Sequence, residues 1–303
     1  MIDNVQRAAR RRYLGSSDAA AVCGRDPWRN AADVWAEKSG KLAPAVDDPN
    51  PALELGRYLE GGILDWTANH LGVPIARDQW FTHPNGVCIS NLDGLVLAAE
   101  PRAIVEAKVS GLLGPPRFLD DFGDAETDAI PQHVLIQVHH QFFCLRADPA
   151  YADVELAYVP VLLVHRGFVL FRVQRSPELC DALLDLELRF WRDHVLADVA
   201  PPDEPPALET LKRFVREPSK TVAIAPELVR DWQAAKATKK IAETEEQEGL
   251  RAVLVALGDA EAGTAGELTV TYLEQTRAAY TAPATTFRVA RLKAPPKPRT
   301  RRE

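Results

Sequence analysis

The chain has 303 residues and a formal net charge of −7, with 46% hydrophobic and 26% charged residues. This composition is typical of a soluble globular protein and excludes a mainly disordered or fibrous chain. The acidic balance excludes a protein that coats DNA over its whole surface, but it leaves room for a local DNA site. No apolar run reaches the roughly 18 residues of a membrane span, and no apolar stretch of a signal peptide follows the basic N-terminus. We therefore expect no membrane association and a cytoplasmic location.

Three helices are predicted in the first part of the chain. A Ser-Ser-Asp segment that starts at Ser16 precedes an alanine-rich stretch, which indicates a short capped helix. Asn30 caps a second helix. A third helix runs from about residue 53 to residue 71, with apolar residues at helical spacing. Gly61 and Gly62 are expected to interrupt it, because each costs about 1 kcal/mol relative to alanine.

From residue 86 onwards the pattern changes to short strands. The runs VCIS, LDG and LVLA are followed by AIVEAKV, and the last two runs predict a hairpin. A helix over residues 131–146, strands over 154–164 and 168–175, and a helix over 177–197 follow. Strands and helices in this mixed order predict an α/β fold whose central sheet is covered on both faces by helices.

The proline-rich segment PPDEPP at residues 201–206 is predicted to be a linker, because four prolines in six residues stop both helix and sheet. We assign the core domain to residues 1–200 and a C-terminal helical and strand extension to residues 207–287. One helix is predicted over residues 226–257 as a solvated, charged helix. Residues 288–303 form a basic tail, which serves either as an arm that follows phosphates or as a solubilising end.

Several residues that are often functional are interpreted as structural. The four cysteines are scattered without a CxxC pair, which indicates reduced, mostly buried thiols and argues against a zinc or iron–sulfur site. The adjacent His139 and His140 point to different sides of their helix, so a histidine metal site is not expected. For the tryptophans at positions 28, 35 and 80, core packing is favoured over stacking on bases.

The stretch that carries chemistry consists of Asp93 and the tripeptide Glu106-Ala107-Lys108. In a strand, alternate side chains point the same way, so Glu106 and Lys108 share a face. The hairpin brings Asp93, at the end of a neighbouring strand, back toward Glu106. Two carboxylates, with the Ala107 carbonyl as a third oxygen, suit a hard ion such as Mg²⁺. Lys108 would then orient and deprotonate an attacking water, with its pKa lowered by burial and the nearby cation. Alone, this pattern also fits a surface ion pair on an edge strand.

The order of motifs along the chain resembles a known family. Glu60 lies in GRYLEGG, Asp93 is followed by glycine, Glu106 opens ExK, and Gln137 lies in QVHHQ, after an N-terminal GSSD. This ordered set resembles the YqaJ-type viral recombinases, the λ-exonuclease-like branch of the PD-(D/E)XK nucleases, over about residues 10–200. Residues 258–293 also look like the tail of phage members. The residue before Asp93 is leucine rather than the proline that names the superfamily.

The resemblance implies a restriction-endonuclease-like core and a Mg²⁺-dependent exodeoxyribonuclease, with Mn²⁺ as a substitute ion. The implied activity is 5′-to-3′ resection of double-stranded DNA ends for single-strand annealing recombination. It also implies a single-strand annealing protein as partner, a possible ring-shaped homotrimer, and a phage or prophage origin in a bacterial host. The alternatives are an endonuclease of the restriction or repair type, a non-catalytic DNA-binding or scaffold protein, and an unrelated α/β protein in which the triplet is accidental.

Carried over to this sequence, the resemblance implies a role for each matching residue. Asp93 and Glu106 bind the catalytic metal, and Lys108 positions or activates the water. Glu60 contributes to a second metal or its water shell, and Gln137 orients the lysine or the water. Taken singly, Glu60 also fits an exposed helical carboxylate, and Gln137 a helix-capping or solvent-facing amide.

A second candidate site lies at the start of the first predicted helix. Free N–H groups and serine hydroxyls at a helix start bind anions, and arginines lie just upstream. Through the resemblance, Arg10, Ser16 and Ser17 are implied to recognise a 5′-terminal DNA phosphate. The alternative role for Ser16 or Ser17 is plain N-capping of the helix.

Overall fold

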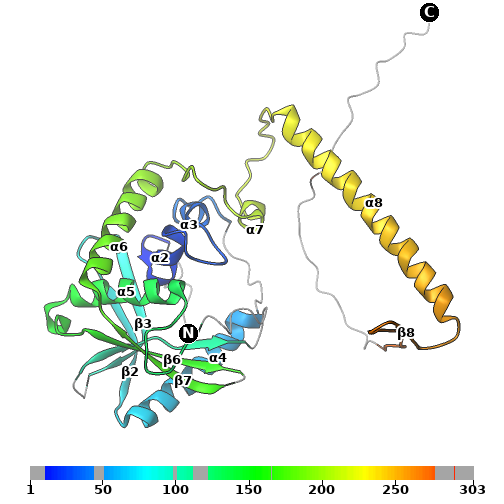
Figure 1. Ribbon diagram of the computed structural model, residues 1–303. Coiled ribbons are helices and arrows are strands. Elements are labelled where there is room, and N and C mark those ends of the chain that lie inside the picture. Colours follow the sequence, from blue (N-terminus) through cyan, green and yellow to red (C-terminus); the bar gives the residue numbers. More distant parts are fainter. Residues whose placement is uncertain are drawn as a thin grey trace, which may run out of the picture. The chain divides into compact units, whose positions relative to one another are not determined.

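The computed structural model describes residues 11–43, 51–97, 101–111, 122–164, 166–276 and 290, although not the side chains of residues 51–53. The chain forms two compact units, residues 1–215 and residues 216–303 (Figure 1). Arg10 and nearly all of the basic tail lie outside the described residues.

The described part of the first unit holds one mixed β-sheet of seven strands. These are β1 (Leu14–Gly15), β2 (Ile75–Thr82), β3 (Cys88–Val96), β4 (Ala103–Val105), β5 (Lys108–Ser110), β6 (Leu156–Leu163) and β7 (Gly167–Gln174). The order is β1-β3-β4-β6-β5, with β2 also paired to β3 and β7 also paired to β6. Strands β1 and β3 run parallel, as do β4 and β5 with β6, and the remaining pairs are antiparallel.

Helices cover both faces of this sheet (Figure 1). The α-helices of the first unit are α2 (Ser16–Val22), α3 (Ala31–Lys38), α4 (Pro51–Leu71), α5 (Gln132–Arg146), α6 (Pro177–Phe190) and α7 (Leu208–Lys212). Ile104 faces α2, α5 and α6 in one buried cluster, whereas the next residue, Val105, packs with Leu64 of α4 in another. Neighbouring strand residues point to opposite faces, so the two clusters lie on opposite sides of the sheet. The predicted mixed α/β fold with a covered central sheet is confirmed.

The strand β3 differs from the sequence prediction. The segments CIS, LDG and LV form one continuous strand, because β3 pairs along its length with β2, a strand that the sequence analysis missed. Asp93 therefore lies within a strand rather than at its end. Gly94 allows this close packing, since a Cβ atom there would lie 2.5 Å from Cγ2 of Ile75. The predicted hairpin is confirmed by the antiparallel pairing of β3 with β4.

Two helices also depart from expectation. Helix α4 runs without interruption through Gly61 and Gly62. Ile63 and Leu64, which follow them, are almost fully buried, and burial of such side chains contributes about 1.5–3 kcal/mol each, which offsets the glycine penalty. The helix expected over residues 177–197 is α-helical to Phe190 and continues as the π-helical segment Trp191–Leu196.

The chain continues to pack on the first unit beyond the proline-rich segment at residues 201–206. The backbone N–H of Ala207 donates to Oδ1 of Asp33 at 2.8 Å, and Phe214 forms an isolated β-bridge with Leu42. These contacts explain why the first unit extends to Val215.

The second unit contains α8 (Pro226–Leu257) and a hairpin of β8 (Ala262–Ala265) and β9 (Leu268–Thr271). The bounds of α8 agree with the predicted helix, and Lys239 lies 3.6 Å from Glu243 in an i,i+4 ion pair. Among the described helices, none has the length and apolar character that crossing a membrane requires.

Candidate active site

The hairpin of β3 and β4 places Asp93 beside Glu106. The last backbone pair of the two strands is Gly94 with Val105, so Asp93 and Glu106 are the next residues on each strand. The backbone N–H of Ala107 donates to Oδ2 of Asp93 at 2.9 Å. Residues Glu106 and Ala107 separate β4 from β5, although both strands keep the same register on β6. The side chain of Asp93 thus accepts a hydrogen bond from the segment between β4 and β5.

Glu106 and Lys108 lie on one face, as predicted. The side chain of Glu106 is 3% exposed and that of Lys108 is 26% exposed, and Lys108 Nζ forms an ion pair with Glu106 Oε1. Lys108 Nζ also donates to Oε1 of Gln137 at 3.1 Å. The structure therefore brings Gln137 from α5 to the lysine with which the sequence analysis associated it.

Two amides from α5 complete the environment of Glu106. Gln137 donates from Nε2 to Oε1 of Glu106, and Gln141 donates from Nε2 to Oε2. Gln141 is fully buried, and its own Oε1 has no hydrogen-bond partner among the described residues. The sequence analysis missed Gln141, although its position four residues after Gln137 places both side chains on one helix face.

The charges at this site shift the pKa values of its members. Burial raises the pKa of Asp93 well above its usual range, and the carboxylates of Glu106 and Glu60 raise it further. Burial alone would lower the pKa of Lys108, but Glu106 and Asp93 raise it. In the metal-free protein the pKa of Lys108 is therefore raised, because two nearby carboxylates stabilise the ammonium more than burial opposes it, and the lowering by a bound cation stays a prediction.

Glu60 belongs to the same electrostatic environment. It lies on α4 and is half-buried, and its pKa is raised by burial and then by the charges of Glu106 and Asp78. Asp78 was not singled out from the sequence. It lies on β2 with φ of 53°, and the pairing with β3 skips it while Arg77 and Gln79 on either side remain paired.

The donor set fits a hard divalent ion held by two protein carboxylates. In the part of the chain that the structure describes, no three His, Cys, Asp or Glu side chains lie close enough together to hold one ion. Mg²⁺ is commonly bound by only one or two carboxylates, with water and substrate phosphate as further ligands. A carboxylate can accept about four hydrogen bonds, and Glu106 accepts three from side chains, so a position remains. The buried carboxylates also outnumber the single Lys108 charge, which favours a cation.

The start of α2 is organised by Asp18 rather than by a serine. The N-cap residue is Gly15, whose N–H donates to Oδ2 of Asp18 at 3.0 Å, so the N-cap role considered for Ser16 or Ser17 is wrong. Ser16 is buried and Ser17 is exposed. Phosphate binding by these two serines stays a prediction.

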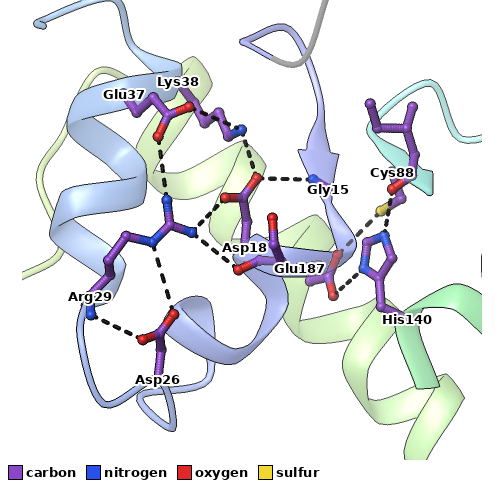
Figure 2. Close-up of polar contacts among 11 residues, drawn as sticks. Gly15, Asp18, Asp26, Arg29, Glu37, Lys38, Cys88, His140 and Glu187 are labelled. Atoms are coloured by element: carbon purple, nitrogen blue, oxygen red, sulfur yellow. Dashed lines mark hydrogen bonds and ion pairs between the residues drawn. The ribbon is translucent and has the colours of Figure 1, made fainter. Parts of the chain in front are cut away.

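Two cations hold Asp18 in place (Figure 2). Lys38 Nζ lies 2.7 Å from Oδ2 of Asp18, and Arg29 Nη2 lies 2.7 Å from Oδ1. Arg29 Nη2 also donates to the carbonyl oxygen of Ser17 at 3.2 Å. Burial alone would raise the pKa of Asp18, but the charges of Lys38 and Arg29 lower it well below its usual range. This buried network fixes the start of α2.

A second buried pair anchors α5 to α6 (Figure 2). His140 Nδ1 lies 2.9 Å from Oε1 of Glu187, both side chains are fully buried, and His140 Nε2 lies 2.9 Å from the carbonyl oxygen of Ile89. Burial lowers the pKa of His140, but Glu187 raises it well above its usual range. His139 instead contacts the backbone of Leu135, so the two histidines point apart as predicted.

The cysteines and tryptophans give a mixed result. All four cysteines are free, and three of them are buried, as predicted. Trp35 is buried at 8% exposure, whereas Trp28 is 62% exposed and Trp80 is 36% exposed, so core packing is wrong for these last two.

A family model matches much of the first half of the chain. Residues 7–148 match the YqaJ-like viral recombinase domain, a span that contains Glu60, Asp93, Glu106, Lys108 and Gln137. The uncharacterized protein YqaJ of Bacillus subtilis is 28% identical over 194 residues, which cover 63% of this chain and 56% of that protein.

Solved structures with similarity to this chain include two exonucleases. The alkaline exonuclease LHK-Exo of Laribacter hongkongensis aligns with a TM-score of 0.47 and 14% identity over 63% of this chain and 91% of that chain. A phage-related exonuclease from Haemophilus somnus aligns with a TM-score of 0.43 and 14% identity over 61% of this chain and 96% of that chain. Residues 7–148 of this chain are thus similar to the YqaJ-like viral recombinase domain.

Proposed function

We propose that this protein is a metal-dependent deoxyribonuclease that degrades double-stranded DNA from its ends in the 5′-to-3′ direction. One observation carries the proposal: Glu106 accepts hydrogen bonds from Lys108, Gln137 and Gln141 while Asp93 lies on the neighbouring strand. A buried carboxylate next to a second carboxylate and a lysine is suited to phosphodiester hydrolysis assisted by a metal ion.

Each residue of the site has a distinct role in this proposal. Asp93, Glu106 and the carbonyl oxygen of Ala107 hold Mg²⁺, for which Mn²⁺ substitutes. The ion supplies Lewis-acid stabilisation of the phosphate and lowers the pKa of bound water. Lys108 holds the attacking water through Nζ, and Gln137 fixes the lysine through the 3.1 Å hydrogen bond to its ammonium.

Glu60 and the start of α2 extend the site. Glu60 contributes to a second metal or its water shell, which is supported by the effect of Glu106 on its pKa. Arg10, Ser16 and Ser17 recognise a 5′-terminal phosphate, and the exposure of Ser17 supports this role. LHK-Exo has also been solved in complex with dAMP, but the structural likeness to it shows no more than a related fold.

The proposed cellular role is resection of DNA ends for single-strand annealing recombination in a phage or prophage. A single-strand annealing protein is the proposed partner, and a homotrimer is the proposed assembly. The competing functions are an endonuclease with the same site and a non-catalytic DNA-binding or scaffold protein.

The test compares linear and closed circular duplexes in the presence and absence of Mg²⁺. Each strand of the linear duplex carries a different 3′ label, and one 5′ end carries a phosphate. We expect Mg²⁺-dependent loss of the 5′-phosphorylated strand and no change in the circle. Cleavage of the circle would support the endonuclease, and binding without hydrolysis in Mg²⁺ or Mn²⁺ would support the non-catalytic protein.

A further inference from the structure

Trp28 is an exposed aromatic side chain on the loop between α2 and α3. It is 62% exposed, in contrast to Trp35 on the next helix, which is 8% exposed. An indole with most of its surface in water contributes little to the core. Its exposure therefore calls for an explanation other than packing.

The loop holds the backbone of Trp28 in one conformation. Oδ1 of Asp26 accepts hydrogen bonds from the N–H groups of Trp28 at 2.8 Å and Arg29 at 3.1 Å. Figure 2 shows Arg29 surrounded by carboxylates, with its guanidinium 2.7 Å from Asp18 and 3.4 Å from Glu37. Because the residue after Trp28 is tied to two helices, the tryptophan is presented from a fixed position. Fixing the backbone at an aromatic residue in this way reduces the entropy lost when its side chain binds a partner.

Trp28 also lies next to the helix face that forms the candidate active site. Its ring makes a T-shaped contact with His133 of α5, with 5.1 Å between the ring centroids and 85° between the planes. His133, Gln137 and Gln141 are spaced by four residues, so they lie on one face of α5. His133 precedes Gln137 by about 6 Å along the helix axis. The tryptophan is therefore about one helical turn from the amide that contacts Lys108.

The chemistry of this position fits a nucleobase. Every base offers a π-face, so stacking on an indole tolerates any sequence, as a nuclease without sequence preference requires. Arg25, on the same loop, is exposed and supplies positive charge for the phosphate backbone. A protein partner would use an extended apolar patch, whereas this loop also carries the charged residues Arg25, Asp26 and Arg29.

We propose that Trp28 stacks on a nucleobase of the DNA strand that enters the active site. The proposal rests on the deoxyribonuclease function proposed above, because the base reaches Trp28 only when the strand lies along α5.

The experiment is a double-mutant cycle between the tryptophan and the base. The Lys108→Ala background is used because it is expected to bind DNA normally and to cut it about 10²–10⁴-fold more slowly. In this background, binding of a fluorescent duplex in Mg²⁺ is measured by anisotropy for the protein with Trp28 and for the Trp28→Ala and Trp28→Phe variants. Each protein is titrated with an intact duplex and with duplexes that carry one abasic residue at successive positions from the 5′ end. Trp232→Ala, which removes an exposed tryptophan of α8, is the matched control.

We expect Trp28→Ala to raise Kd about tenfold or more, Trp28→Phe to stay within about threefold, and Trp232→Ala to have no effect. One abasic position should weaken binding to the protein with Trp28 by a similar factor and have no further effect in Trp28→Ala. The proposal would be overturned if the effects of Trp28→Ala and of the abasic residue on Kd were additive at every position. An unchanged Kd in Trp28→Ala would also overturn it and would favour a protein partner for Trp28. The proposed deoxyribonuclease function is tested separately, by DNA hydrolysis with the protein in which Lys108 is intact. A failure of that function can therefore be distinguished from a failure of the stacking proposal.

Discussion

Asp93 and Ala107 are joined by a 2.9 Å hydrogen bond from the backbone N–H of Ala107 to the carboxylate of Asp93. Ala107 lies between Glu106 and Lys108, so this bond fixes the position of all three residues relative to β3. A carboxylate that accepts a hydrogen bond from a backbone N–H is held in one orientation, and a metal ligand needs such a fixed orientation. The bond connects two segments that are 14 residues apart in the chain.

Lys108→Ala should lower the rate of Mg²⁺-dependent DNA hydrolysis by about 10²–10⁴-fold while leaving DNA binding close to normal, since general acid–base catalysis contributes this much. Hydrolysis is followed with labelled duplex and binding by anisotropy. Lys41→Ala, which removes a surface pair with Asp198, is the control and should retain its activity. Unchanged turnover in Lys108→Ala would exclude the proposed role of the lysine.

Gln141→Leu should raise the Mg²⁺ concentration for half-maximal activity about tenfold or more. The change removes the hydrogen-bond donor to Oε2 of Glu106. Mutation of a residue that hydrogen-bonds a metal ligand typically lowers metal affinity by about 10–100-fold. The change also leaves the buried Oε2 of Glu106 without its amide donor, so the metal-free protein should lose about 1–3 kcal/mol of stability. Gln79→Leu on β2 is the control. An unaltered Mg²⁺ dependence would show that Gln141 does not position Glu106.

Glu60→Gln should shift the pKa of Asp93 downward, toward its usual range. Burial is the main cause of the raised Asp93 pKa, with Glu106 and Glu60 adding to it, so removal of one charge gives a partial shift. Carboxyl ¹³C NMR titration of the metal-free protein measures it, with Glu54→Gln as control on the same helix.

The raised pKa of Asp93 has a further consequence for stability. The folded state holds this proton more tightly than the unfolded state does, so the metal-free protein loses stability as pH rises from about 4 through the raised pKa. Mg²⁺ should bind more tightly over the same range, because protons compete with it. Urea unfolding with and without Mg²⁺ checks both trends, and metal affinity that is independent of pH would contradict them.

Ser17→Ala should reduce the preference for 5′-phosphorylated over 5′-hydroxyl DNA ends several-fold, since an exposed hydroxyl at the start of α2 would be lost. The ratio of initial rates on the two substrates measures this preference. Thr244→Ala, which removes an exposed hydroxyl of α8, is the control. The same ratio in Ser17→Ala and in the unmodified protein would remove Ser17 from phosphate recognition.

Glu187→Gln should destabilise the protein most at and below about pH 6.5. His140 has a raised pKa, so its pair with Glu187 contributes fully below the ordinary histidine pKa and is lost as pH rises through the raised value. Breaking a buried pair typically costs about 3–5 kcal/mol. Urea unfolding across the pH range checks the trend, with Asp181→Asn on the exposed side of α6 as control. A loss of stability that grows with pH would contradict this assignment.

The sequence by itself determined most of the helices, the mixed α/β class and the convergence of Asp93, Glu106 and Lys108, whereas the resemblance to a known family pointed to Gln137. Helix periodicity and capping act within a few residues, so α8 and the helix capped by Asn30 could be read directly. The alternation of side chains in a strand placed Glu106 and Lys108 on one face for the same local reason.

The tertiary structure decided what depends on partners distant in the chain. The sequence pattern divided β3 because its polar residues interrupt the apolar runs, whereas pairing with β2 keeps it continuous. The pKa of Lys108, the burial of Gln141 against Glu106 and the exposure of Trp28 could not be predicted, because each depends on which charges and surfaces the fold brings together. Local pattern fixes the direction in which a side chain points, but its solvation and charge environment arise only when separate segments pack.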